Sequence, residues 1–269
     1  MMEETKNSAL CERILAALAA FGRDPLGLVA ADLYPIDQMH PRGAAAVRDL
    51  AALVGLKAGE SVLDIGCGIG GPARLLAAEF GARVSAFDLD PSAVAAAECL
   101  TARVGLGSRL AFSAANALDM PFAGAAFDLA WVQQSAMTIA DKARLYAGIR
   151  RVLKPGGRLA LGDCLAGPGG AAHFPLPWSP DGRFSFLLEA ADLKAQLRAA
   201  GFRQLAWNEA TAAAIVFFRN MIERLAKEAV PPPGAQLVMG PRFAEMVANL
   251  LRSLEQDRVR LVEAAFAAV

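Results

Sequence analysis

"SVLDIGCGIGGPARLL", residues 61–76, is the stretch of sequence that decides the fold. An apolar run with the character of a buried strand, 61–65, leads into four glycines within six positions, 66–71, and a helical segment follows. Glycine at a turn between strand and helix leaves the backbone bare, so a ligand can approach it closely. A tight turn without a ligand is the alternative interpretation. The stretch predicts a ligand site at the carboxyl end of a strand.

The composition limits the class of protein. With 269 residues, the chain fits one large α/β domain, or a domain with an attached lid. Lys and Arg together number 27, as do Asp and Glu, so the charge balance does not favour nucleic acid. The first ten residues lack a basic segment leading into an apolar one, and charges interrupt every apolar run before the roughly 20 residues of a membrane span. We expect a cytoplasmic protein with no nucleic-acid partner and no membrane.

The four cysteines are scattered along the chain. They are Cys11, Cys67, Cys99 and Cys164. None belongs to a Cys-x-x-Cys pair, which argues against a zinc site and against a disulfide framework. We therefore expect no metal and no disulfide, as suits a reducing cytosol.

Apolar strands alternate with helical segments through the middle of the chain. The expected strands cover 61–66, 83–90, 109–115, 127–134, 158–163 and 202–208, and the expected helices cover 72–80, a segment starting at 91, 141–153 and 190–200. Asp90 and Pro91 suit the N-cap and first position of a helix. The alternation predicts a mostly parallel sheet with helices on both faces.

The two ends of the chain follow a different rhythm. A weak helix at 8–21 is followed by a Pro- and Gly-punctuated loop or lid, 22–43, and by a helix through Val54 that Pro41 opens. Near the other end, 212–229 and 241–256 show helical periodicity, and 258–266 has the pattern of a short final strand.

The glycine loop leaves two classes of nucleotide ligand open. Its first, second and fourth glycines fit the dinucleotide pattern G-x-G-x-x-G, and its first three fit the G-x-G-x-G of S-adenosylmethionine enzymes. Asp64, two residues before the first glycine, would repel a pyrophosphate and attract an ammonium or sulfonium. Asp88, at the end of the second strand, suits the ribose hydroxyls of either ligand. Asp64 thus favours S-adenosylmethionine over a nicotinamide dinucleotide.

Four blocks of sequence together resemble the class I S-adenosylmethionine-dependent methyltransferases. In the family order they are "VLDIGCGIGG", "VSAFDLDPSAV", "NALDMPFAGAAFDLAW" and "VLKPGGRLAL". The resemblance covers 50–165. "HPRGAAAVRDLA", "AGPGGAAHFPLPW" and "LVMGPRFAEMVANL" are further similar to the group of sarcosine/dimethylglycine and ubiquinone-type methyltransferases.

The resemblance implies a Rossmann-like α/β fold with a seven-stranded, mostly parallel sheet. The last strand would run antiparallel, with a helical insertion before it near the C-terminus. We expect one structural domain made of N-terminal helices and a cofactor lid, 1–55, an S-adenosylmethionine-binding core, 56–210, and the helical insertion with the final strand, 211–269. The insertion would form a wall of the acceptor pocket, pack as core or provide the surface of a homodimer.

The resemblance also implies which residues bind S-adenosylmethionine, with S-adenosylhomocysteine as the product. Asp64, Gly66 and Gly68 would line the methionine part, and Asp88 would hold the ribose. Leu89 would pack on the adenine, whose edge Asn116 and Ala117 would meet. Gln133 would lie beyond the fourth strand, and Tyr34 and Gln38 would cover the cofactor from the N-terminal loop. Asn116 departs from the aspartate usual in the family. Its amide keeps an acceptor oxygen but adds a donor, so we expect adenine contacts to weaken and binding to survive.

The acceptor side is less constrained by motif. The only two histidines, His40 and His173, are the candidates for a catalytic base or for positioning the acceptor. Phe174 and Trp178 would offer apolar walls or a cation–π face. The alternatives for these four residues are loop surface and loop packing.

The last acceptor candidates follow the fourth strand or lie in loops. Gln134 and Met137 would form the floor of the acceptor site, although methionine at this spacing is also typical of core packing. Arg42 and Arg183 are the loop arginines that a carboxylate-bearing amine would need.

The chemistry needs an in-line displacement with the acceptor atom held roughly 3 Å from the methyl carbon and water excluded. An amine only has to arrive unprotonated, whereas a phenol or activated carbon needs a proton acceptor. We expect methyl transfer from S-adenosylmethionine to a small-molecule acceptor, with N-methylation of an amine first. The alternatives are C- or O-methylation of an apolar acceptor such as a quinone or isoprenoid precursor, a NAD-dependent oxidoreductase, and cofactor binding without catalysis.

Overall fold

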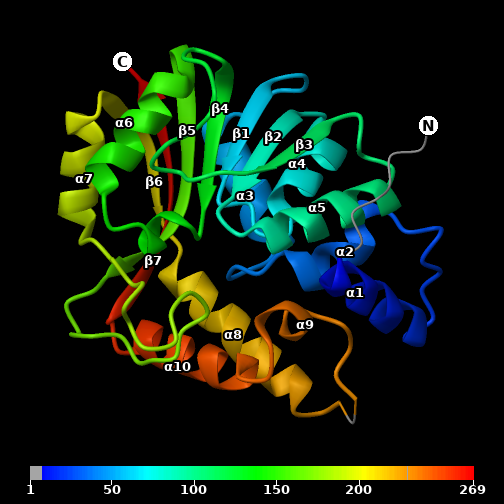
Figure 1. Ribbon diagram of the computed structural model, residues 1–269. Coiled ribbons are helices and arrows are strands. Elements are labelled where there is room, and N and C mark those ends of the chain that lie inside the picture. The colour runs from blue at the N-terminus through cyan, green and yellow to red at the C-terminus, as the bar shows by residue number, and fades with distance from the viewer. Residues whose placement is uncertain (1–7, 229) are drawn as a thin grey trace.

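The computed structural model describes residues 8–228 and 230–269, and a seven-stranded sheet forms its centre (Figure 1). The strands are β1 (Ser61–Ile65), β2 (Arg83–Asp88), β3 (Leu110–Ala114), β4 (Phe127–Gln133), β5 (Leu153–Ala166), β6 (Phe202–Glu209) and β7 (Val259–Ala268). Their order across the sheet is β3-β2-β1-β4-β5-β7-β6. The first five strands pair in parallel, and β7 runs antiparallel to both β5 and β6. The expected Rossmann-like α/β sheet with an antiparallel last strand is confirmed.

Helices cover both faces of the sheet. They are α1 (Ala9–Ala20), α2 (Ala30–Asp37), α3 (Ala44–Val54), α4 (Gly71–Phe80), α5 (Pro91–Arg103), α6 (Lys142–Val152), α7 (Ala190–Ala199), α8 (Thr211–Leu225), α9 (Gln236–Met239) and α10 (Phe243–Glu255). One face buries Ile149 of α6 and Leu197 of α7, and the other buries Leu50 of α3 and Leu75 of α4. Asp90 caps α5 as expected, since its side chain accepts a hydrogen bond from the backbone N–H of Ser92.

The helical insertion precedes β7, as expected. In Figure 1, α8, α9 and α10 lie together below the sheet, with α1 and α2 beside them. Buried Phe218 of α8 and Leu250 of α10 belong to one apolar cluster with Leu261 of β7, which attaches the insertion to the sheet. Among the described helices, none is long and apolar enough to cross a bilayer.

Two local expectations are wrong. The stretch 22–43 is not loop throughout, because Ala30–Asp37 forms α2 despite an internal Pro35. Leu33 and Ile36 of that helix are fully buried, so tertiary burial outweighs the local Pro and Gly signals. The strand expected at 158–163 is longer, because the "KPGG" segment, 154–157, also lies within β5 (Leu153–Ala166), and the β4–β5 pairing shifts register beside it.

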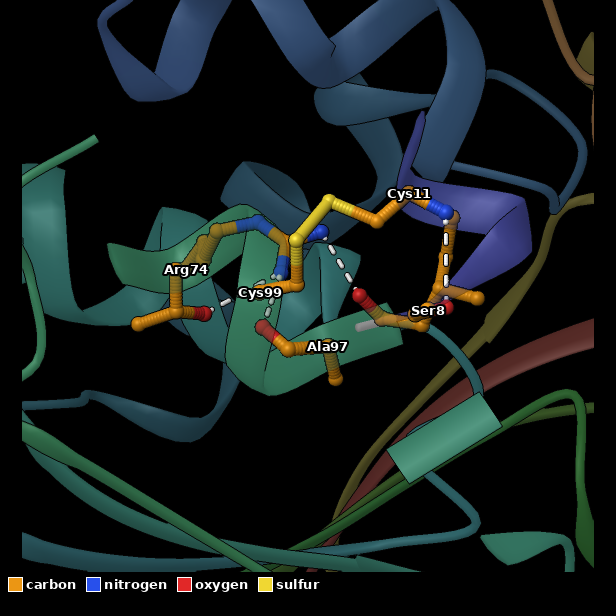
Figure 2. The surroundings of a disulfide bond; sticks show 7 residues. Ser8, Cys11, Arg74, Ala97 and Cys99 are labelled. Atoms are coloured by element: carbon orange, nitrogen blue, oxygen red, sulfur yellow. Dashed lines mark hydrogen bonds between the residues drawn. A yellow bond between two sulfur atoms is a disulfide. The ribbon is translucent and has the colours of Figure 1, made fainter. Parts of the chain in front are cut away.

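The expectation of four reduced thiols is also wrong. Cys11 of α1 and Cys99 of α5 form a disulfide with their Cα atoms 6.3 Å apart (Figure 2). The pair is 88 residues apart in sequence, and only the packing of α1 on α5 brings the two thiols together. Cys67 and Cys164 are free and buried.

Candidate active site

A cavity of about 1170 Å³ lies at the carboxyl ends of the central strands. Its lining residues follow β1, β2, β3 and β4, and further walls come from α2, α8, α9 and α10. Open α/β sheets bind ligands at this edge. Pockets for a single ligand measure roughly 300–1,000 Å³, so this cavity has room for a nucleoside cofactor and an acceptor together.

The glycine loop forms one wall of the cavity, and two of its glycines are required by close packing. Gly66 has φ +76°, and a Cβ there would lie 2.5 Å from the Cβ of Ser135. A Cβ on Gly71 would lie 2.2 Å from the carbonyl oxygen of Asp37. The C-terminal end of α2 can therefore pack against α4 only because residue 71 is a glycine. Gly68 faces the cavity, and its N–H donates to Asp88 Oδ2 over 2.8 Å.

Asp64 contributes a buried carboxylate to the cavity wall. It is 2 % exposed, and its Oδ2 atom has no hydrogen-bond partner in the described residues. Burial, with a smaller contribution from the negative charge of Asp88, raises the pKa of Asp64 to about 7. A buried, unpaired carboxylate oxygen is costly unless a donor or cation meets it. The site therefore fits the positively charged methionine part of S-adenosylmethionine.

Asp88 is the last residue of β2 and Leu89 follows it, and both line the cavity. Asp88 Oδ1 accepts the N–H of Asp90 over 3.0 Å, and Oδ2 accepts that of Gly68. Each carboxylate oxygen keeps a lone pair, so Asp88 can still accept two ribose hydroxyls. Leu89 is 72 % exposed, which leaves an apolar surface for a nucleobase ring.

Asn116 and Ala117 line the cavity after β3. The Asn116 Oδ1 atom accepts the N–H of Leu118 over 2.9 Å. This bond holds the side chain against its own turn and takes up one acceptor site of the amide. An adenine amine would therefore have only the second lone pair of Oδ1, so the structure gives a reason for the weaker adenine contact that we expect.

The end of β4 and the residues after it form the floor of the cavity, which is lined by Gln133, Gln134 and Met137. Gln133 Oε1 accepts from Trp131 Nε1 over 3.1 Å. Gln134 adopts φ +55°, and its Oε1 accepts from the thiol of Cys164 over 3.2 Å. Hydrogen bonds to side chains of β4 and β5 thus fix the two glutamine side chains.

The segment around α2 forms the roof, where Tyr34, Asp37, Gln38 and His40 line the cavity. The Tyr34 hydroxyl donates to Glu79 Oε1 of α4 over 3.0 Å. Burial, followed by the hydrogen bond to Glu79, raises the pKa of Tyr34. The hydroxyl therefore stays protonated and ties α2 to α4.

His40 lies at the end of a buried hydrogen-bonded chain. Its Nε2 lies 3.2 Å from Gln38 Oε1, Gln38 Nε2 donates to Asp37 Oδ1 over 3.0 Å, and Arg74 donates to Asp37 Oδ2 over 2.8 Å. His40 is 8 % exposed, and its Nδ1 has no partner in the described part of the chain. Burial lowers the pKa of His40 to about 4. A hydrogen bond with the Pro41 backbone opposes this shift, and the positive charge of Arg42 adds to it. The ring is neutral at pH 7.

Two predicted acceptor residues lie outside the cavity. His173 Nε2 lies 2.8 Å from Gln256 Oε1, and its backbone N–H donates to Ser253 Oγ of α10 over 3.0 Å. These bonds hold the loop against α10, and Phe174 packs beside Gly182 against the apolar cluster of α8, α10 and β7. Trp178 does line the cavity, with its Nε1 donating to Ser185 Oγ over 3.0 Å.

The predicted loop arginines are engaged elsewhere. Arg42 pairs with buried Glu263 over 2.8 Å and with Asp49. Arg183 pairs with Asp181 over 2.7 Å on the surface. Neither lines the cavity, so they do not form the expected carboxylate site.

The insertion supplies cavity residues that sequence reasoning missed. They are Phe217, Phe218 and Met221 of α8 and Phe243, Val247 and Leu250 of α10. The apolar stripe at helical spacing in 241–256 was the available signal, but a stripe of this kind does not reveal whether it faces core or cavity. Arg224 is the one charged side chain that α8, α9 and α10 bring to the cavity within residues 211–228 and 230–255.

Comparison with protein families finds a methyltransferase domain over residues 63–161. Tocopherol O-methyltransferase of Arabidopsis thaliana is 40 % identical over 102 residues, which cover 38 % of this chain and 29 % of that protein. O-methyltransferase resE of Aspergillus sclerotiorum is 32 % identical over 169 residues, which cover 60 % of this chain and 62 % of that protein. The aligned segments thus span less than two thirds of either relative.

Solved structures share the fold over most of the chain. The [4+2]-cyclase SpnF is 24 % identical with a TM-score of 0.68, covering 96 % of this chain and 92 % of that one. Phosphoethanolamine N-methyltransferase 2 of Haemonchus contortus, in complex with S-adenosyl-L-methionine, is 23 % identical with a TM-score of 0.71, covering 95 % and 60 %. At these identities the likeness establishes the fold.

Proposed function

We propose that this chain, which belongs to the class I S-adenosylmethionine-dependent methyltransferases, transfers a methyl group from S-adenosylmethionine to a hydroxyl of an apolar small molecule. S-adenosylmethionine supplies an electrophilic methyl carbon on a sulfonium leaving group. The residues of the chain then have to hold donor and acceptor in line, exclude water and take up the acceptor proton. The choice of substrate class rests on the apolar residues of α8 and α10 that line the cavity.

The cofactor half of the cavity supports donor binding through residues that the sequence already singled out. The unpaired Asp64 Oδ2 would meet the ammonium or sulfonium, Asp88 the ribose, and exposed Leu89 the adenine. Gly68 would present bare backbone to the methionine chain, whereas the missing side chain of Gly66 makes room for Ser135. The second N–H of the Gln38 amide would reach the carboxylate of the cofactor. A nicotinamide dinucleotide would instead bring its pyrophosphate toward Asp64.

The acceptor half favours an apolar molecule over a carboxylate-bearing amine. The six apolar residues of α8 and α10 named above face it. Arg42 and Arg183 are engaged elsewhere, and among the described residues Arg224 of α8 is the one arginine that lines the cavity. Burying apolar surface yields roughly 25 cal/mol per Å², so these helices would select an acceptor with a hydrocarbon body. The O-methyltransferases among the relatives, such as tocopherol O-methyltransferase, favour a hydroxyl group as the acceptor.

His40 is the candidate proton acceptor for a hydroxyl substrate. The ring lines the cavity and is neutral at pH 7, and its Nδ1, which is buried without a hydrogen-bond partner among the described residues, would have to turn toward the acceptor to take the proton. Positioned general bases contribute about 10²–10⁴ in rate. N-methylation of a neutral amine stays the second candidate, because the Trp178 ring in the cavity wall could face a methylated ammonium product.

Acceptor binding to the protein saturated with S-adenosylhomocysteine tests this choice. Calorimetric titration would compare an alkyl-substituted phenol, unsubstituted phenol and sarcosine. We expect the alkylphenol to bind more tightly than phenol and sarcosine not to bind. Met221→Asp, inside the cavity, should weaken the alkylphenol at least tenfold (about 1.4 kcal/mol), whereas Ile222→Asp on the outer face of α8 should not. Sarcosine binding without alkylphenol binding would overturn the proposed acceptor class.

A further inference from the structure

The cavity residues that α8 contributes form one stripe along the helix. They are Phe217, Phe218, Met221, Arg224 and Leu225. Positions i, i+1, i+4, i+7 and i+8 share one face of an α-helix. At a rise of about 1.5 Å per residue, the stripe extends about 10 Å from Phe217 to Arg224. The face that α8 turns to the cavity is therefore apolar along most of its length, with a single guanidinium near one end.

The stripe leads from the floor of the cavity to its mouth. The N–H of Leu261 donates to Thr211 Oγ1 over 2.9 Å, which fixes the start of α8 to β7 (Figure 1). Phe218 shares an apolar cluster with Met137, a residue of the cavity floor. Arg224 follows more than one helical turn later and is exposed, although it lines the cavity. A side chain with both properties lies where the cavity opens to solvent.

Charge divides the cavity into two halves. Arg224 is the one cationic side chain that lines it within the described residues. The acidic side chains that line it are Asp37, Asp64, Asp88 and Asp90. Of these, Asp37 is neutralised by its ion pair with Arg74. The other three belong to the cofactor half, so negative charge gathers there and one positive charge marks the mouth of the acceptor half.

The Arg224 guanidinium has no ion-pair partner in the part of the chain that the structure describes. Arg219, the other arginine of α8, pairs with Glu255 of α10. Glu228, four residues beyond Arg224, has the helical spacing to compete for it, but Glu228 Oε2 makes no hydrogen bond with the described residues. Arginine presents a planar fork of N–H donors that matches the oxygens of a carboxylate or phosphate. The free fork of Arg224 fits such an anion.

We propose that Arg224 binds an anionic group, a carboxylate or a phosphate, at the far end of the acceptor, whose hydrocarbon body lies along the α8 stripe. That the opposite end carries the methylated hydroxyl rests on the proposed function. The division of charge sets the direction of binding, because Asp64 and Asp88 repel an anion and Arg224 attracts it. Arg224 is thus a specificity-determining residue that selects amphiphilic acceptors and points their uncharged end at the cofactor.

Calorimetric titration of the protein saturated with S-adenosylhomocysteine tests the anion site with probes that lack an acceptor hydroxyl. They are octanoate, octyl phosphate, butanoate and the uncharged octanamide. We expect octanoate to bind about fivefold or more tightly than octanamide, the effect of one exposed ion pair. Butanoate should bind more weakly than octanoate, because it covers less of the stripe. Added salt should narrow the difference between octanoate and octanamide. The tighter of octanoate and octyl phosphate identifies the anion.

Arg224→Gln should reduce the affinity for octanoate to that for octanamide and leave the affinity for octanamide unchanged. Lys227→Gln is the matched control, because it removes the same charge from an exposed side chain that does not line the cavity. Glu228→Gln should not weaken octanoate, since Glu228 is not expected to hold Arg224. Octanoate binding no tighter than octanamide binding in the wild type, or an equal loss in Lys227→Gln, would overturn the proposal.

Two further readouts separate this proposal from its neighbours. S-adenosylhomocysteine affinity should be the same in Arg224→Gln and the wild type, and a fall would place the cofactor carboxylate at Arg224 and overturn the proposal. An alkylphenol that binds and is methylated while octanoate shows no preference over octanamide would contradict this proposal alone. A preference for octanoate that Arg224→Gln abolishes, without methylation of any hydroxyl, would contradict the proposed function alone.

Discussion

Asp64→Asn should stabilise the protein without ligand and weaken its binding of S-adenosylmethionine. Asp64 is buried with an unpaired Oδ2, and its pKa rises from 3.8 to about 7. A folded-state pKa above the unfolded value means that the folded state binds the extra proton, so this contribution to stability is present below pH 4 and is lost as pH rises through 7. At 1.36 kcal/mol per pKa unit, the ionised carboxylate costs the folded state about 4 kcal/mol above pH 8.

The asparagine removes that cost, so the free energy of unfolding at pH 8 should rise by roughly 2–4 kcal/mol, and by little at pH 4. Binding should change in the opposite direction. Two unit charges 4 Å apart interact by about 4 kcal/mol at an effective dielectric of 20, and desolvation of the ligand cation consumes part of this. We expect S-adenosylmethionine to bind at least tenfold more weakly, equivalent to about 1.4 kcal/mol.

Chemical denaturation at pH 4 and pH 8, with calorimetric titration of both adenosyl ligands, measures the two effects. A loss confined to S-adenosylmethionine places the sulfonium at Asp64, and equal losses for both ligands place the ammonium there. Asp163→Asn is the matched control, because burial also raises the pKa of that carboxyl to about 7 although it does not line the cavity. Unchanged affinity in Asp64→Asn, or a loss as large in Asp163→Asn, would refute the reasoning.

Three further predictions concern other parts of the site and the fold. Asp88→Ala should weaken S-adenosylhomocysteine binding at least tenfold in calorimetry, because two hydrogen bonds to a charged group contribute about 1.5 kcal/mol or more each; unchanged affinity would contradict the ribose assignment. His40→Gln should lower kcat for a hydroxyl acceptor by about 10²-fold or more. His173→Gln should leave kcat unchanged, because His173 lies against α10 outside the cavity. Equal losses of kcat in the two variants would contradict the role proposed for His40. Replacing Cys11 and Cys99 together by alanine should lower the unfolding free energy by about 2–4 kcal/mol in a denaturant titration. A count of four thiols in the unreduced wild-type protein would show that the disulfide does not form.

The sequence predicted the elements whose signals are local. Asp90 and Pro91 mark the start of α5 where it begins, and the alternation of apolar strands and helical segments predicts the sheet. The glycine loop and the carboxylates at the carboxyl ends of β1 and β2 could be assigned because strand ends of a parallel sheet meet at one edge.

The remaining features depend on contacts between distant segments. The disulfide joins residues 88 apart in sequence, and α2 forms because Leu33 and Ile36 are buried by neighbouring helices. His40 and His173 look alike in sequence, since both lie in Pro-rich loops. Only the folded chain shows that one lies in the cavity roof and the other against α10.

Transfer of a labelled methyl group tests the central claim most directly. The protein would be incubated with S-adenosylmethionine carrying a deuterated methyl group and an equimolar mixture of an alkylphenol, its methyl ether and sarcosine, and the products would be separated by mass spectrometry. The account predicts that the label appears on the alkylphenol oxygen, that the methyl ether is inert, and that S-adenosylhomocysteine forms in equal amount. Label on sarcosine with none on the phenol would contradict it.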